Sequence, residues 1–235
     1  MSFRIRRVTT TRAGGVSARP FDSFNLGDHV GDDPAAVAAN RARLAETAGL
    51  GADRLVWMNQ VHSDHVVHVG GPVDAPIDHA DGVVTTVPRL ALVVVTADCV
   101  PVLMADARAG VVAAVHAGRR GAQNGVVARA VECMLAAGAT VGDLSVLLGP
   151  AVSGTHYEVP EAMADEVEAA LPGSRTSTSA GTPGVDLRAG IVRQLRGMGV
   201  TAIDVDPRCT VADTSLFSYR RDGRTGRLAS LVWLE

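Results

Sequence analysis

Short apolar runs and longer amphipathic segments follow one another along most of the chain, and together they predict a mixture of strands and helices. Continuous or alternating apolar residues over a few positions are typical of strands, and apolar residues three and four apart are typical of helices. The expected strands are 4–12, 55–69 (one strand or a pair), a short one within 79–87, 90–98, 100–106, 110–116, 144–150, 202–207 and 228–235. The expected helices are 34–50, 121–138, 160–173 and 185–200.

These elements do not alternate strictly, and two neighbouring strands share a short turn, which argues against a parallel doubly wound sheet. The pattern predicts an α/β fold: a mixed-sheet α/β/α sandwich with helices on both faces. The Gly- and Ser-rich segment 172–184 is expected to be a surface loop between two helices. No linker separates the chain into parts, so we expect a single domain over residues 1–235.

A predicted hairpin brings one cysteine close to one histidine. The segments 100–106 and 110–116 are separated by "ARAG", a connection short enough to join only antiparallel strands. Pairing Ala105 with Val111 places Val100 opposite His116, so that Cys99, the residue before Val100, lies diagonally next to His116. Opposed side chains on a hairpin lie about 5 Å apart, so Cys99 and His116 can reach one ion or one substrate atom even if the register is wrong by one residue.

The segment "NQVHSDHVVHV" carries three further histidines, His62, His65 and His68. On a strand His62 and His68 would share one face and His65 would lie on the other, so the three do not form a ready metal clamp. His62 is the best candidate for a third ligand beside Cys99 and His116, because it follows the buried-looking run "WMNQV".

Charge narrows the possible partners. The chain has a net charge of −3, and all 22 basic residues are arginines. The charge favours neither nucleic acid nor an anionic membrane as a partner, and the lack of lysine excludes Schiff-base chemistry and a Walker phosphate loop. An anionic substrate would be held by arginines or backbone amides, for which the glycine-bracketed pair Arg119 and Arg120, before an expected helix, is well placed.

The three cysteines, Cys99, Cys133 and Cys209, are too few and too scattered to indicate a disulfide framework. The first residues are basic but lack the apolar core of a signal peptide, and no apolar run is long enough to span a bilayer. We therefore expect a cytoplasmic protein with reduced thiols. The sequence does not indicate the oligomeric state.

Taken together, eight ordered segments between about Thr9 and Leu234 resemble the laccase-domain family, also known as YfiH-like and as polyphenol oxidase or purine nucleoside phosphorylase. The matching segments are "TTRAGGVS", "FNLGDHVGDDPAAVAANRARL", "NQVHS", "ADGVVT", "TADCVPVLMAD", "AVHAGRRG", "LGPAVSGTHYEV" and "SYRRDGRTGRLASLVWL". The resemblance implies a fold similar to the catalytic domain of the cytotoxic necrotizing factor toxins.

The resemblance also implies a catalytic metal held by His62, Cys99 and His116. Two imidazoles and a thiolate suit zinc, and copper as well, better than magnesium or calcium. The implied reaction is phosphorolysis of the purine nucleosides adenosine, inosine and methylthioadenosine, with adenosine deamination as a second activity. Asn25 and Arg41 match family positions that look like substrate contacts.

The arginines that could hold the phosphate are Arg120, Arg220 and Arg221. Two departures from the family pattern bear on substrate preference. Arg119 stands where the family usually has tryptophan, and Thr155 and His156 stand where it often has cysteines.

Three other functions remain open. One is a metal-free Cys–His hydrolase or deamidase, with Cys99 as nucleophile and His116 as base. Another is a copper-dependent polyphenol oxidase, which the absence of any His-X-His pair disfavours. The third is a binding or regulatory protein without enzymatic activity.

Overall fold

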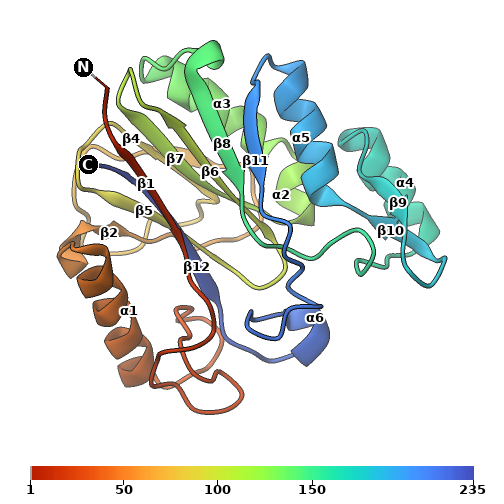
Figure 1. Ribbon diagram of the computed structural model, residues 1–235, viewed down its shortest axis with the longest axis horizontal. Helices are drawn as coiled ribbons and strands as arrows, with labels where there is room; N and C mark the ends of the chain where they lie inside the picture. The colour runs from red at the N-terminus through yellow and green to blue at the C-terminus, as the bar shows by residue number, and fades with distance from the viewer. Residues whose placement is uncertain (1) are drawn as a thin grey trace.

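The computed structural model describes residues 2–235 and contains two mixed sheets that pack face to face, as Figure 1 shows. The four-stranded sheet has the order β1 (Ile5–Thr9), β12 (Leu228–Leu234), β5 (Ala91–Thr96), β2 (Leu55–Val56). The six-stranded sheet has the order β11 (Ala202–Val205), β8 (Leu144–Leu148), β6 (Val100–Asp106), β7 (Val111–Ala117), β4 (Gly82–Thr85), β3 (Val66–His68). Each sheet combines antiparallel pairs with parallel ones.

Helices cover the outer faces of both sheets (Figure 1). α1 (Pro34–Ala48) lies on the four-stranded sheet, and α3 (Val126–Ala136) and α5 (Leu187–Gly197) lie on the six-stranded sheet. The remaining helices are α2 (Arg119–Gln123), α4 (Glu161–Ala170), α6 (Tyr219–Asp222) and two short 3-10 turns, Ala52–Arg54 and Val141–Asp143. The expected mixed-sheet α/β sandwich is confirmed, and its β layer consists of two sheets. None of these helices in residues 2–235 is long and apolar enough to cross a bilayer.

The alternation of side chains along β5 and β7 determines where the candidate site forms. Leu92 and Val94 of β5 point into the space between the sheets, where they meet Val112 and Ala114 of β7. Since alternate residues share a face, the next positions of the same two rows are Thr96 and His116. These two polar residues therefore lie at one end of the core between the sheets, where the apolar packing stops.

The hairpin of β6 and β7 is confirmed, but its predicted register is wrong by one residue. Val100 pairs with Ala117, and Asp106 pairs with Val111. The turn determines this register, because the Asp106 carboxylate accepts the backbone N–H groups of Arg108 and Ala109, both at 2.9 Å. Cys99 still lies at the open end of the hairpin, one residue before β6.

Three other predictions are corrected by the structure. Most of 55–69 is a loop between the short strands β2 and β3. The Gln60 side chain bonds the backbone N–H and carbonyl of Val95 in β5, and the Asp81 carboxylate accepts the backbone N–H of His62, so side chains replace the strand pairing that was expected. The helix expected over 121–138 is interrupted at Gly125, which has a left-handed φ of 88°. The expected loop 172–184 contains a small hairpin, β9 (Arg175–Ser177) with β10 (Pro183–Val185). α6 was not predicted.

Candidate metal centre and the cavities around it

The structure brings His62, Cys99 and His116 together from three separate parts of the chain. The ligand atoms of these three residues all lie within 4.8 Å of one another. Cys99 Sγ is 3.8 Å from His62 Nε2, and the rings of His62 and His116 meet edge to face with centroids 4.7 Å apart. The group predicted from the hairpin and the family resemblance is therefore one cluster that could hold a metal ion.

Asp81, which precedes β4, orients both histidines. This fully buried carboxylate lies 2.8 Å from His116 Nδ1 and accepts the backbone N–H groups of His62, at 3.0 Å, and Ser63, at 2.6 Å. The bond to Nδ1 leaves Nε2 of His116 free for an ion, an arrangement common around protein-bound metals. The turn of residues 61–63 around Asp81 also places His62, which has a left-handed φ of 63°.

Asp98 holds the backbone next to Cys99. Its carboxylate accepts hydrogen bonds from the hydroxyl groups of Thr210, at 2.6 Å, and Ser218, at 2.7 Å. It also accepts the backbone N–H of Arg220 at 2.7 Å. These contacts tie Cys99 to the C-terminal segment 210–222, although the two are more than a hundred residues apart in the chain, and they support the left-handed φ of 93° at Asp98.

Gly118 leaves room for the cluster. A Cβ atom at this position would lie 2.5 Å from His62 Cδ2 and 3.1 Å from Cys99 Sγ. The backbone of Gly118 has ordinary dihedral angles, φ −72° and ψ 170°. The glycine of "HAGRRG" is therefore required by close packing against the candidate ligands rather than by its conformation.

The ionisable groups of the cluster strongly affect one another. Burial raises the pKa of the Cys99 thiol, but the neighbouring His116 and His62 outweigh it and lower that pKa to about 6. Burial lowers the pKa of His116, but Cys99 and Asp81 together raise it to about 9. Burial likewise raises the pKa of Asp81, and hydrogen bonds from His116 and Ser63 bring it to about 2. Cys99 and His116 therefore favour each other's charged forms.

Three cavities border Cys99. The arginine cavity, of about 330 Å³, is lined by His62, Cys99, Arg119, Arg120 and Tyr157. The tyrosine cavity, also of about 330 Å³, is lined by Ala97, Asp98, Cys99, Arg119, Val152, Tyr157, Leu187, Tyr219 and Arg220. The threonine cavity, of about 280 Å³, is lined by His29, Gln60, His62, Val95, Thr96, Ala97, Cys99, His116, Tyr219 and Arg227.

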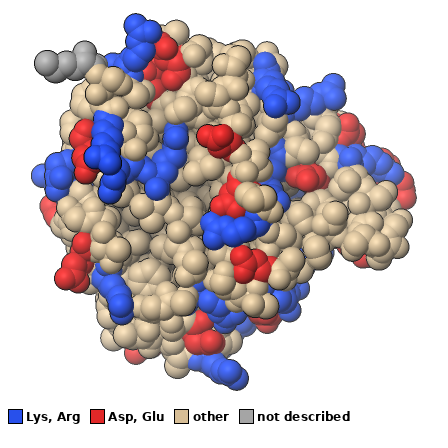
Figure 2. Space-filling view, viewed as in Figure 1, with Lys and Arg blue, Asp and Glu red and all other residues tan. Residues whose placement is uncertain are grey.

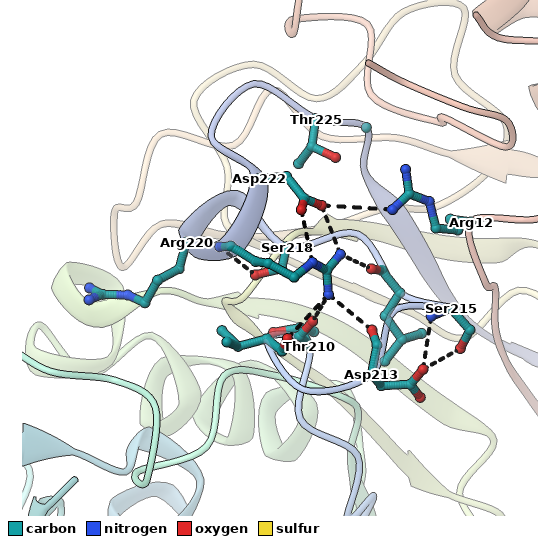
Figure 3. A network of polar contacts seen from close by, with 12 residues as sticks. Arg12, Thr210, Asp213, Ser215, Ser218, Arg220, Asp222 and Thr225 are labelled. Carbon is teal, nitrogen blue, oxygen red and sulfur yellow. Dashed lines mark hydrogen bonds and ion pairs between the residues drawn. The ribbon is translucent and has the colours of Figure 1, made fainter. Parts of the chain in front are cut away.

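The arginines predicted to hold phosphate differ in their placement. Arg120 lines the arginine cavity, and Arg220 lines the tyrosine cavity, where its guanidinium lies 4.6 Å from the ring centre of Tyr157. The Arg221 guanidinium instead donates to the carbonyls of Thr210 and Leu216 and to the carboxylate of Asp222. Figure 3 shows the network that includes Thr210 and Asp222. Arg221 therefore supports the segment 210–222 and does not line any of the three cavities.

Asn25 also supports a loop. Its side chain is fully buried, and its amide is bonded to Gly27, Asp32 and Arg227. It lines none of the three cavities, although Arg227 lines the threonine cavity.

Arg41 lies away from the cluster. Its guanidinium donates to the carbonyl of Leu26, pairs with Asp28 at 3.1 Å and stacks on Trp57 at 3.9 Å. The cavity that it lines shares no residue with those around Cys99.

Several residues of the site were missed from the sequence. Asp81, Asp98 and Tyr157 lie within the segments that resemble the family. The roles of the two carboxylates become evident only from the groups that face them in the structure. Thr155 and His156 line none of the three cavities; instead they form a cluster with Ser153 and Cys209, in which His156 Nδ1 lies 3.0 Å from Ser153 Oγ. The positions at which Thr155 and His156 differ from the family pattern thus lie away from the candidate metal centre.

Comparison with known proteins identifies the family of this chain. Residues 6–235 match the family described as "Multi-copper polyphenol oxidoreductase laccase". The chain belongs to this family. It is 75% identical over 235 residues to a protein of Mycobacterium tuberculosis named purine nucleoside phosphorylase, a match that covers all of this chain and 94% of the relative. A protein of Corynebacterium glutamicum with the same name is 56% identical over 232 residues, covering 98% of this chain and 94% of the relative.

Solved structures of the family share the fold. YlmD from Geobacillus stearothermophilus superimposes with a TM-score of 0.92 at 32% identity, covering 98% of this chain and 92% of that one. The Bacillus licheniformis protein YfiH superimposes with a TM-score of 0.91 at 29% identity, covering 100% and 97%. The resemblance to YfiH-like proteins predicted from the eight segments is thereby confirmed.

Proposed function

We propose that this protein is a metal-dependent purine nucleoside phosphorylase. It converts adenosine and inosine, with phosphate, to the free base and ribose 1-phosphate, and methylthioadenosine to adenine and 5-methylthioribose 1-phosphate. The observation that carries the proposal is the 75% identity, over the whole chain, to a relative named purine nucleoside phosphorylase. The cavities around Cys99 support it, because they offer both arginines for an anion and space for a nucleoside. Adenosine deamination is proposed as a second activity of the same site.

His62, Cys99 and His116 would hold the metal. Two imidazoles and a thiolate fit zinc, and copper also, and Asp81 already fixes His116 in the orientation that a ligand needs. When bound, the ion would polarise an oxygen of phosphate or water. Figure 2 shows arginines and carboxylates interspersed on one face of the molecule, which gives that face no continuous basic surface for a nucleic acid.

The arginines of the site would position phosphate. In the reaction, a phosphate oxygen forms a bond to C1′ of the ribose, and the base leaves with the electron pair of the C1′–N9 bond and takes up a proton. Arg119 and Arg120 in the arginine cavity, and Arg220 in the tyrosine cavity, would balance the charge of the phosphate as it approaches C1′. Asn25 and Arg41 would act indirectly, because they hold the loop that carries His29 of the threonine cavity.

The test is a product assay on purified protein with inosine, with and without phosphate, paired with elemental analysis. We expect phosphate-dependent release of hypoxanthine and ribose 1-phosphate, and one zinc or copper ion per chain. Release of hypoxanthine without phosphate, or no reaction with any of the three nucleosides, would contradict the proposal. Adenosine without phosphate gives the matched assay for deamination, since inosine is then the product.

A metal-free Cys–His hydrolase or deamidase is the second candidate. It is supported by the approach of Cys99 Sγ to His62 Nε2 at 3.8 Å and by the position of His116 beside them, which suits a nucleophile and a base. Chelation separates the two candidates. A hydrolase would keep its activity after the metal is removed and would lose it on alkylation of Cys99, whereas the phosphorylase would lose activity on chelation and regain it with zinc or copper.

The family description also names copper oxidation. Such an enzyme needs several copper sites, and within residues 2–235 the metal-ligand group found is the single set His62, Cys99 and His116. This makes a multicopper oxidase the weakest of the candidates. Oxygen uptake with a phenolic substrate in copper-loaded protein is the measurement that would favour it.

A further inference from the structure

The hydroxyl group of Thr96 is buried at the candidate site without a partner. Thr96 is the last residue of β5 and is 2% exposed, and its Oγ1 has no hydrogen-bond partner among residues 2–235. A buried polar atom that loses its bonds to water and gains none in the protein destabilises the folded state. The threonine cavity lies directly against this residue. The presence of a hydroxyl group at this position is therefore explained if a ligand in the cavity forms the missing hydrogen bond with it.

The position of Thr96 places that ligand next to the candidate metal ligands. Thr96 ends the inner row of β5, and His116 ends the facing inner row of β7, so the two residues meet at the same end of the space between the sheets. The cavity between them has apolar walls, Val95 and Ala97, and an aromatic side chain, Tyr219. Polar side chains such as Gln60 and Arg227 complete the lining, and a pocket that combines apolar walls with hydrogen-bonding groups suits a small organic molecule.

The charges around Cys99 separate the two substrates. The arginine cavity has two guanidinium groups, Arg119 and Arg120, for a doubly charged phosphate. The threonine cavity has only one, Arg227, whose Nη1 already donates to the carbonyls of Thr225 and Gly226 at 3.0 and 3.1 Å. The arginine cavity therefore offers phosphate one guanidinium group more than the threonine cavity does.

We propose that the threonine cavity binds the nucleoside and that the Thr96 hydroxyl is one of its recognition groups, while phosphate enters from the arginine cavity. This inference rests on the proposed phosphorylase function. The two cavities share His62 and Cys99. Substrates held in them would meet at the candidate metal centre, with the ribose between the base and the phosphate, as displacement at C1′ requires.

The substitution Thr96→Val tests the assignment, because valine has nearly the same shape and lacks only the hydroxyl. Since that hydroxyl has no partner in the protein, we expect the variant to unfold at a temperature no lower than the wild type. The dissociation constant for inosine, measured by calorimetry without phosphate so that no phosphorolysis occurs, should rise roughly 2- to 12-fold, the loss expected for one neutral hydrogen bond. The KM for phosphate should stay unchanged.

Thr225→Val is the matched control. Thr225 is 1% exposed, and its Oγ1 also lacks a partner among the described residues, as the isolated side chain in Figure 3 shows. Its side chain lines none of the three cavities. The same chemical change at Thr225 should therefore leave both inosine binding and the KM for phosphate as in the wild type.

The outcomes distinguish this inference from the proposed function. If Thr96→Val binds inosine as tightly as the wild type does, or raises only the KM for phosphate, the assignment of the threonine cavity is wrong. The proposed phosphorylase function is then unaffected, because it depends on the activity of the wild type. An equal loss of binding in Thr96→Val and Thr225→Val would also overturn it, since the effect would then come from the loss of a buried hydroxyl in general. Absence of phosphorolysis and inosine binding in the wild type would overturn the proposed function and this inference with it.

Discussion

Gly118→Ala is expected to damage the candidate metal centre without unfolding the protein. The backbone of Gly118, with φ −72° and ψ 170°, is open to alanine, so the substitution introduces no backbone strain. The added methyl group would instead lie 2.5 Å from His62 Cδ2 and 3.1 Å from Cys99 Sγ. His62 is exposed and lies on a loop, so its ring can move outward to relieve the contact.

The size of that movement determines the effect on metal binding. Carbon atoms pack at about 3.5–4.0 Å, so the His62 ring has to retreat by about 1 Å. Metal–ligand distances tolerate deviations of only about 0.2 Å. A displacement several times that tolerance removes His62 as an effective ligand. We expect metal affinity to fall at least by the roughly 10- to 100-fold that is typical when a ligand loses its orientation.

The assay is competition with a chromogenic zinc chelator, with thermal unfolding of the chelated protein measured alongside. Gly142→Ala is the matched control, because a Cβ at Gly142 would meet nothing within 4 Å. We expect Gly142→Ala to bind zinc like the wild type and Gly118→Ala to bind it far more weakly, with both chelated variants unfolding within a few degrees of the wild type. Wild-type zinc affinity in Gly118→Ala would refute the reasoning, because it would show that His62 is not needed in its present position.

Three further predictions concern the site and its supports. Cys99→Ala, and equally His116→Ala, should abolish phosphorolysis and deamination together, since the two reactions attack different carbon atoms and share only the metal; a variant that keeps one of the two activities would argue against a common ion. Asp106→Asn should lower the free energy of unfolding by about 1–3 kcal/mol in urea titrations at pH 7, because its carboxylate accepts three backbone N–H groups. Burial raises the pKa of Asp106, but those hydrogen bonds outweigh it and lower the pKa. The stabilisation is therefore present above the usual carboxyl pKa and is lost as the pH falls below that value. The difference in unfolding free energy between variant and wild type should shrink in acid, and an unchanged difference at pH 3 would contradict this. Arg221→Ala should lower the free energy of unfolding by several kcal/mol, because its guanidinium supports the segment 210–222; a normal melting temperature would disprove this role.

Much of the fold follows from local sequence patterns. The buried strands β5, β6 and β7 were predicted because a strand covered on both faces must be apolar throughout. The helix expected over 34–50 is α1, which begins at Pro34 with Asp33 as its N-cap. The proximity of Cys99 to His116 was predictable for the same reason, since a short turn between two apolar strands permits only an antiparallel return. The third candidate ligand, His62, was identified by the family resemblance. Strand periodicity could not place it, because its segment forms a loop in the structure.

Where the chain depends on distant side chains, local patterns failed. The loop 57–65 has the composition of a strand, but Asp81 and the backbone of β5 bind its polar groups and keep it out of the sheet. Arg221 and Arg41 had the sequence context of substrate-binding residues, yet their guanidinium groups are bonded to backbone carbonyls that lie elsewhere in the chain.

The sequence by itself determined the types of the elements, the central hairpin and, through its motifs, the family. Only the tertiary structure decided which polar groups face a cavity and which are already bonded. Hydrophobic periodicity is a property of neighbours in the chain, so it can be read locally. A side chain's role depends on whether a partner from another element reaches it: Asp81 is satisfied by the turn that it organises, whereas the Thr96 hydroxyl meets no protein group at the end of the two sheets.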